Sequence, residues 1–311
     1  RRNRYSVGMM ESRRLTATFR TDQGRTRETN QDFVAWREPD GPEAAGRDGW
    51  LYVLADGAGG MDAGEVASRY ATERTVAHYL ALAGEKDWAL RLHRAMLNAN
   101  RDLRNLSASQ ATQNRMATTM VAVVVAGDRA FIANVGDSRA YFWRRGELQQ
   151  VTRDQSLIAK LLEEGAITEA EAATHPRRHV ILYSLGSERD PRIDLYELAL
   201  QPGDQILLCS DGLTRHVSDD ELAIILGEQD PEEATAALVR LANERGGHDN
   251  ISVGVLRVET VAGGERVRQG HRAKRAEAVP TPARTFLLGY TLFLSLLQTV
   301  LISALWFWLL Y

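Results

Sequence analysis

The sequence contains a single cysteine, Cys209. One cysteine excludes a disulfide framework, and the absence of any Cys/His ligand spacing argues against a zinc site. Cys209 lies in the apolar run Ile206-Leu207-Leu208-Cys209, which is typical of a buried strand. We therefore interpret this thiol as a structural residue rather than as a nucleophile or a ligand.

An excess of positive charge is also lacking. The chain has 38 Lys and Arg residues against 41 Asp and Glu residues, with a formal net charge of −3. This balance provides no basic footprint for general nucleic-acid binding, so we expect no nucleic-acid partner. With 311 residues, of which 44% are hydrophobic and 25% charged, the composition is globular and can fill one large core or two modest ones.

Long uncharged segments are rare, and the exception covers residues 286–311, where 26 consecutive residues carry no charge. As a helix rising about 1.5 Å per residue, this segment exceeds a hydrocarbon core of roughly 30 Å. We predict one transmembrane helix; the alternative is a buried core helix, which is usually shorter and has a polar face. Residues 259–285 form a basic linker with six basic and three acidic residues, so the positive-inside rule predicts a cytoplasmic location for the preceding domain, at the inner membrane.

The apolar pattern over residues 15–258 alternates between strand and helix periods, whereas residues 1–14 form a polar N-terminal tail. Expected strands include 50–55, 119–125, 129–135 and 139–143, and expected helices are 64–83, 87–106, 157–164 and 231–245. The short turns at 127–128 and 145–146 are compatible only with antiparallel neighbours, which predicts a meander. Capping boxes begin at Thr168 and Ser218, and Asp230 can cap a helix that starts at Pro231. Strands in groups with helices between them predict an α+β fold.

Four aspartates lie at the ends of strand-like runs or directly after them, where a rigid sheet can aim their carboxylates at one point. They are Asp32, Asp56, Asp211 and Asp249. Carboxylate oxygens are the ligands that Mg²⁺ and Mn²⁺ prefer, and gathered carboxylates repel one another strongly without a cation. Glycine follows Asp56 and Asp211, which lets the backbone turn sharply and a carbonyl approach a metal. One Asp-Gly pair is more often a simple turn, so the set as a whole carries the prediction.

A cationic partner stands five residues before the first of these aspartates, in Gly24-x-x-Arg27-x-x-Asn30-Gln31-Asp32. The fixed fork of donors on an arginine can hold a phosphoryl group with two hydrogen bonds. Taken alone, Arg27 would more often be an ordinary surface charge. Together with the four aspartates, it favours phosphoryl chemistry at a metal centre.

These motifs resemble those of the metal-dependent protein phosphatases of type 2C, in their bacterial form. The matching segments follow in the same order across residues 15–258: Gly24 to Asp32, Asp56-Gly57-Ala58-Gly59-Gly60, Asn134-x-Gly136-Asp137-Ser138-Arg139, Ser210-Asp211-Gly212-Leu213 and Asp249-Asn250-Ile251. The resemblance implies a four-layer α/β/β/α sandwich, in which two antiparallel sheets are flanked by helices. It also implies a protein serine/threonine phosphatase that hydrolyses phosphoserine and phosphothreonine with a water activated by two Mn²⁺ or Mg²⁺ ions.

The resemblance assigns a role to each motif residue. Asp56 would bridge the two ions, and Gly57 would contribute its backbone carbonyl. Asp32 and Asp211 would bind one ion on each side, and Asp249 would complete the site together with Asp211. Arg27 would bind the phosphoryl group of the substrate.

Other positions extend this pattern or depart from it. Asp137 resembles the acidic residue that helps to hold a third, weaker metal ion. Ala58 stands where many bacterial relatives have Met and some eukaryotic ones have a His proposed as general acid, so we assign the proton donor to a metal-bound water. Gln31 replaces a common Glu, and we interpret His248 as a surface or outer residue rather than as a ligand.

Residues 153–186 resemble the variable flap beside the active site of bacterial members. Its basic turn, which contains Arg177, Arg178 and His179, could engage a phosphopeptide or form a solvated loop. The expected partners are phosphorylated proteins, the substrates of a serine/threonine kinase. One alternative is a catalytically inactive phosphatase-like module for sensing or interaction, which the loss of any of the four aspartates would have favoured. Another is a regulatory phosphatase that acts on anti-sigma-factor antagonists.

Overall fold

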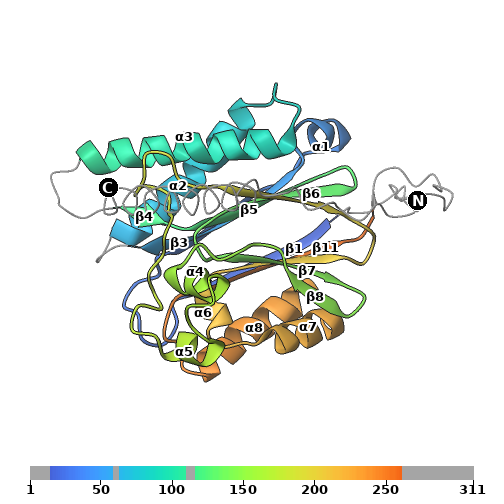
Figure 1. Cartoon of the computed structure of the whole chain (residues 1–311). Coiled ribbons are helices and arrows are strands. Elements are labelled where there is room, and N and C mark those ends of the chain that lie inside the picture. The colour runs from blue at the N-terminus through green and yellow to red at the C-terminus, as the bar shows by residue number, and fades with distance from the viewer. Residues whose placement is uncertain (1–14, 59–62, 110–115, 261–311) are drawn as a thin grey trace, which may run out of the picture. The chain divides into compact units, whose positions relative to one another are not determined.

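Two antiparallel sheets stack face to face, and helices cover both outer faces (Figure 1). The structure is a computed structural model that describes residues 15–58, 63–109 and 116–260. The predicted α+β fold with two antiparallel sheets flanked by helices is therefore confirmed. Its arrangement follows from the strand order and from the apolar faces that each layer must bury.

The first sheet has the strand order β1-β11-β10-β7-β8. Its strands are β1 (Leu15–Asp22), β11 (Ile251–Val258), β10 (Gln205–Cys209), β7 (Arg139–Arg144) and β8 (Glu147–Gln150). The second sheet has the order β2-β3-β5-β6-β9, with β4 paired to β3. Its strands are β2 (Asp32–Arg37), β3 (Trp50–Ala58), β4 (Ala117–Thr118), β5 (Met120–Ala126), β6 (Arg129–Val135) and β9 (Asp194–Ala199).

Each sheet has its own helical cover (Figure 1). Over the second sheet lie α1 (Pro42–Asp48), α2 (Ala63–Ala81) and α3 (Trp88–Ser109). Over the first sheet lie α6 (Asp211–Thr214), α7 (Asp219–Glu228) and α8 (Pro231–Glu244). The short helices α4 (Leu157–Glu163) and α5 (Glu169–Thr174) belong to the segment between β8 and β9.

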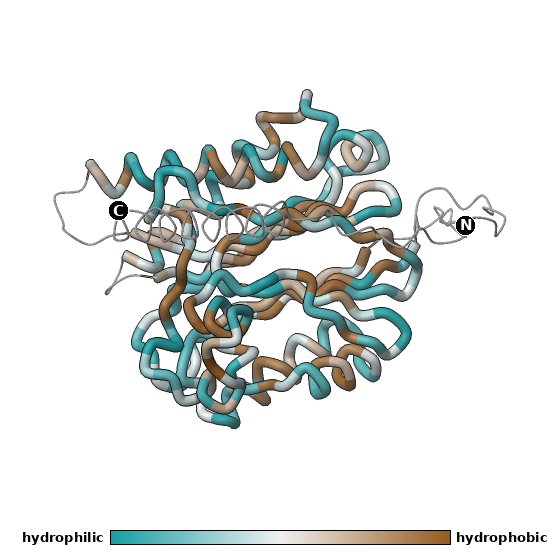
Figure 2. Tube along the Cα trace, in the orientation of Figure 1, coloured by the Kyte–Doolittle hydropathy of each residue, from teal (hydrophilic) through white to brown (hydrophobic). Residues whose placement is uncertain are grey.

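Strand β5 shows why the layers stack in this way. All seven of its residues are buried, because its two faces pack into different cores. Met120, Ala122 and Val124 face α2 and α3, whereas Val121 and Val123 face the other sheet. A strand buried on both sides reads as a continuous apolar run, which is the pattern of this segment. Figure 2 shows hydrophobic residues concentrated along the strands and on the inner sides of the helices.

Local signals placed several helix starts correctly. The Thr168 and Ser218 side chains both form the predicted capping boxes, with Glu171 and Glu221 respectively. Asp230 accepts hydrogen bonds from two backbone N–H groups at the start of α8. Helix α1 was not predicted from the sequence.

The predicted meander is wrong at one step. Strand β7 does not continue beside β6 but pairs with β10 and β8 in the other sheet. The free edge of β6 is taken by β9 instead, with Arg129 opposite Ala199. The chain crosses between the sheets at Gly136, whose φ of 99° and whose approach to the Thr119 side chain both require glycine. The short link between β6 and β7 therefore connects two different sheets rather than two neighbouring strands of one sheet.

Among the described helices, none combines the length and the apolar character needed to cross a membrane. The predicted transmembrane helix at 286–311 lies outside the described residues, as do the tail at 1–14 and nearly all of the linker at 259–285.

A buried ion pair joins the helices over the second sheet. The Arg91 side chain of α3 is fully buried and donates to Asp48 Oδ1 at 3.1 Å, to the Arg47 carbonyl at 2.7 Å and to the Tyr79 carbonyl at 2.8 Å. Its guanidinium also lies 4.0 Å from the centre of the Tyr79 ring. One cation thus connects α1, α2 and α3.

We expect Asp48→Ala to lower the free energy of unfolding by about 3 kcal/mol, because it leaves the Arg91 charge buried without its counter-ion. Urea unfolding followed by tryptophan fluorescence measures this loss. The matched control is Asp40→Ala, which breaks an exposed pair with Arg37 and should cost less than about 1 kcal/mol. Equal losses in the two variants would contradict a special role for the buried pair.

Candidate metal centre

The four predicted aspartates come from both sheets and lie at one end of the sandwich. Asp32 opens β2 and stands directly opposite Asp56 of the neighbouring strand β3. Asp211 is the first residue of α6, one residue beyond the end of β10, and Asp249 lies one residue before the start of β11. Because β10 and β11 are paired, their ends bring Asp211 and Asp249 together. The charges of Asp32, Asp211 and Asp249 all act on Asp56, which places the set within electrostatic reach.

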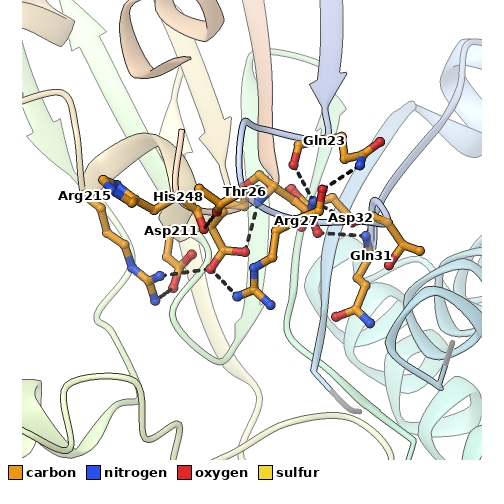
Figure 3. A network of polar contacts seen from close by, with 12 residues as sticks. Gln23, Thr26, Arg27, Gln31, Asp32, Asp211, Arg215 and His248 are labelled. Atoms are coloured by element: carbon orange, nitrogen blue, oxygen red, sulfur yellow. Dashed lines mark hydrogen bonds and ion pairs between the residues drawn. The ribbon is translucent and has the colours of Figure 1, made fainter. Parts of the chain in front are cut away.

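A hydrogen-bond network joins the two sheets beneath these carboxylates. The Asn250 side chain accepts from the Gln31 backbone N–H at 2.8 Å and donates to the Gln23 and Thr29 carbonyls. Ser210 Oγ, next to Asp211, donates to Asp32 Oδ2 at 2.8 Å. These contacts hold the loop before β2 against the ends of β10 and β11, so the positions of the aspartates are coupled. Figure 3 shows part of this network around Gln23, Gln31 and Asp32.

Gly57 occupies a position that only glycine can fill. A Cβ atom there would lie 2.2 Å from the Gly64 carbonyl oxygen and 2.7 Å from the Gln31 carbonyl oxygen. The Gly57 N–H also donates to that Gln31 carbonyl at 3.0 Å. Close backbone packing beside Asp56 is thus the physical reason for this Asp-Gly pair.

Burial makes the charged form of these acids unfavourable. It raises the pKa of Asp32 to about 7, against the opposing effect of hydrogen bonds from Ser252 and Ser210. Burial also raises the pKa of Asp56 well above its usual value, and the neighbouring charge of Asp32 adds to this. The pKa of Asp137, in the link between β6 and β7, rises to about 7, and that of Asp211 to about 6, again mainly through burial.

Three of these acids have an oxygen atom that lacks a donor. Within the described part of the chain, Asp32 Oδ1, Asp137 Oδ1 and Asp211 Oδ1 are buried and accept no hydrogen bond. A buried carboxylate oxygen needs a donor or a cation, and an all-oxygen set suits Mn²⁺ or Mg²⁺. The residues therefore fit divalent cations. Across residues 15–58, 63–109 and 116–260, no three acidic, histidine or cysteine side chains already converge as a complete ligand set.

Two arginines share one of the carboxylates. Arg27 Nη2 donates to Asp249 Oδ2 at 2.8 Å, and Arg215 Nη1 donates to the same oxygen at 2.9 Å. Arg215 also forms an ion pair with Asp211 Oδ2. Figure 3 shows the two guanidinium groups approaching from opposite sides. The sequence motifs predicted Arg27 near the aspartates but not Arg215, although the spacing of four residues between Asp211 and Arg215 is that of a helical ion pair.

The flap segment reaches the same region. Partial desolvation of its ring lowers the pKa of His179, and the positive charges of Arg215 and Arg178 lower it further. Arg177, Arg178 and His179 are all exposed. The basic turn of the flap thus lies within electrostatic range of Arg215, with its side chains open to solvent.

Two other sequence predictions concern residues outside the ligand set. Cys209 is fully buried, and burial raises the pKa of its thiol to about 12, so it is not a nucleophile at neutral pH. His248 is exposed and stacks on His216, with the ring centres 5.2 Å apart. Its position agrees with the interpretation as a surface residue.

Comparison with known proteins places this chain and its fold in a family. The family model for protein phosphatase 2C matches residues 23–250. A serine/threonine phosphatase, stp, from Listeria monocytogenes is 36% identical over 243 residues, covering 77% of this chain and 94% of the relative. The structure of the Streptococcus agalactiae serine/threonine phosphatase matches with a TM-score of 0.68 at 35% identity and covers 79% of this chain and all of that one.

A further solved structure contains metal ions. The catalytic domain of the phosphatase PstP, in complex with two manganese ions, matches with a TM-score of 0.67 at 34% identity, covering 79% of this chain and 98% of that domain. The predicted enzyme class, a metal-dependent protein-serine/threonine phosphatase, is confirmed. This chain belongs to the protein phosphatase 2C family, in agreement with the resemblance of its motifs.

The raised pKa values predict an unusual pH dependence of stability. A carboxyl group with a higher pKa in the folded state than in the unfolded state stabilises the fold when protonated, and this contribution is lost as the pH rises through the folded pKa. In EDTA, we therefore expect the melting temperature to fall between about pH 5 and pH 8. The free energy of unfolding should fall by up to about 1.4 kcal/mol per pH unit for each such group.

The matched variant for this test is Asp32→Asn, which removes one titrating group and should flatten the slope. Differential scanning calorimetry in EDTA across the pH range measures both proteins. A melting temperature that rises with pH in wild type, or equal slopes in the two proteins, would rule out burial of Asp32 as the cause.

Proposed function

We propose that Asp32, Asp56, Asp211 and Asp249, with the Gly57 carbonyl, hold two divalent cations at which phosphoserine and phosphothreonine are hydrolysed. The observation that carries this proposal is the register of β2 and β3, which sets Asp32 directly opposite Asp56. The charge of Asp211 raises the pKa of both residues, so it lies within electrostatic range of the pair. The buried oxygens without donors on Asp32 and Asp211 support it. Asp137 has a similar oxygen and is the candidate for a third, weaker site.

The cations, Mn²⁺ or Mg²⁺, would supply the charge that activates a water and neutralises the phosphoryl oxygens. The chain's own residues supply position and exclusion of bulk water. Ser210 orients the Asp32 carboxylate, and the backbone beneath Gly57 is fixed by its contact with Gln31. Arg27, half exposed and held by Asp249, is placed to donate to phosphoryl oxygens. Ala58 has no proton to donate, so the proton for the leaving alkoxide is assigned to a water.

The proposed substrates are phosphorylated proteins, and two observations favour an enzyme over an inactive module. All four aspartates are present and gathered, and the relatives that cover most of this chain are called serine/threonine phosphatases. The exposed basic turn with Arg177 and Arg178 offers donors for an extended phosphopeptide. A narrower regulatory substrate would use the same centre.

We expect full-length protein in Mn²⁺ to release phosphate from a phosphothreonine peptide, and EDTA to abolish this release. Asp56→Asn should lower kcat by at least about 100-fold, because a neutral amide cannot bridge two cations and the metal-activated nucleophile supplies several kcal/mol. Phosphate release at saturating Mn²⁺ measures the effect, and circular dichroism checks the fold.

Arg27→Ala is the contrasting variant. It should raise KM for the peptide more clearly than it alters the half-saturating concentration of Mn²⁺, because its guanidinium is assigned to phosphate and pairs with only one of the proposed ligands, Asp249. For the Asp56→Asn variant, retention of more than about a tenth of the wild-type rate would contradict the assignment of Asp56 to both cations.

We further propose that residues 286–311 anchor the enzyme at the inner membrane, with the phosphatase domain in the cytoplasm. The 26 uncharged residues and the basic linker before them support this proposal. The anchor would determine location only, since every proposed ligand lies before residue 250.

This anchor predicts that the full-length protein sediments with membranes after lysis and resists extraction by high salt. A chain that ends at Glu259 should be soluble and keep its rate on a small phosphopeptide. The reason is that a solved relative, whose whole chain matches 79% of this one, forms the same fold. Full-length protein in the supernatant would exclude the anchor. So would an insoluble shortened domain, which would instead make residues 286–311 part of the core.

A further inference from the structure

The side chain of Arg215 lies across two of the carboxylates assigned to cations. It is tied to Asp211 Oδ2 and to Asp249 Oδ2, and these two carboxylates are only 16% and 15% exposed. A forked guanidinium can serve two acceptors at once, which a point charge does less well. We infer that Arg215 is an internal counter-ion that competes with divalent cations for Asp211 and Asp249, and thereby sets the cation concentration at which this part of the centre fills. This inference rests on the proposed two-cation site.

The hydrogen bonds of Asp249 make the competition direct. Its Oδ1 accepts from the Asn250 N–H at 2.9 Å, and its Oδ2 accepts from both Arg27 and Arg215. Oδ2 thus already accepts from two donors, so a cation can bind this oxygen only by replacing one of the two arginines, whereas Oδ1 has one donor and keeps one lone pair. Asp211 is different, because its Oδ1 has no donor among the described residues while its Oδ2 is held by Arg215.

The two arginines differ in what their release would free. Of these two carboxylates, Arg27 pairs only with Asp249 in the described part of the chain, whereas Arg215 pairs with both. Arg215 also lies four residues after Asp211, and its backbone N–H bonds to the Asp211 and Leu213 carbonyls at the end of α6. The backbone can therefore stay in place while the side chain, already 31% exposed, swings towards solvent. Arg215 is the group whose displacement opens the pair.

The competition predicts that removal of Arg215 changes the stability of the fold differently in the absence and in the presence of saturating cation. Without a competing cation in solution, Arg215 offsets the repulsion between Asp211 and Asp249, so its removal should destabilise the fold. With saturating cation, the same carboxylates are neutralised by the metal, and the removal of Arg215 should cost nothing. A merely structural arginine would lower stability under both conditions, and a substrate-binding arginine would change neither.

The test compares wild type with Arg215→Met, which keeps much of the side-chain volume but not the charge. Isothermal titration with Mn²⁺ on the full-length protein should show the dissociation constant falling about three- to tenfold in the variant. Its melting temperature should be lower than that of wild type in EDTA and equal or higher in saturating Mn²⁺. Arg215→Lys should give an intermediate Mn²⁺ affinity and carries the test if the methionine variant does not fold.

The matched control is Arg245→Met, which removes a nearby guanidinium of similar exposure that pairs with Glu221 and not with the aspartates. It should leave Mn²⁺ affinity unchanged. Unchanged or weaker Mn²⁺ binding by the Arg215 variants, with normal binding by wild type, would overturn the inference and leave the proposed function standing. Failure of wild type to bind Mn²⁺ or to release phosphate would overturn both.

Discussion

Four aspartates gather at one end of the β-sandwich, and the rest of the site is organised around their mutual repulsion. Asp32 and Asp56 face each other across two strands of one sheet, and Asp211 and Asp249 come from the ends of two paired strands of the other. Carboxylates that lie close together and are buried raise one another's pKa, and their charged forms oppose folding. Each other feature of the site can be understood as a way to hold or to neutralise this charge.

The apolar core of the two packed sheets holds the acids in place. Three of the four strands that lead to these acids, β3, β10 and β11, are largely buried, so the sheets are fixed by burial of apolar surface rather than by the site itself. Polar side chains then set the exact positions, with Asn250 and Ser210 joining the loop before β2 to the ends of β10 and β11. A site built on strand ends in this way tolerates electrostatic strain that a flexible loop would relax.

Arginine acts in two ways around these acids. Arg91 neutralises a buried acid far from the centre and never needs to move, because its pocket is closed. Arg27 and Arg215 stand at the open edge of the centre and are 51% and 31% exposed, so their contacts can be exchanged for those of a substrate or a cation. The difference in solvent access separates a structural ion pair from a functional one.

The family, the α+β class, the capping boxes and the burial of Cys209 could be predicted from the amino-acid sequence and are confirmed. The same motifs singled out the four aspartates and Arg27, whose roles remain predictions. All of these depend on residue type and local order, and apolar periodicity or short motifs record them directly. The departure of β7 from the meander to the other sheet could not be predicted from local order, since pairing depends on which distant strand, here β9, takes the edge of β6. Only the tertiary structure showed that Arg215 holds Asp211 and Asp249 together, because these two residues are 38 positions apart in the sequence and meet only where β10 pairs with β11.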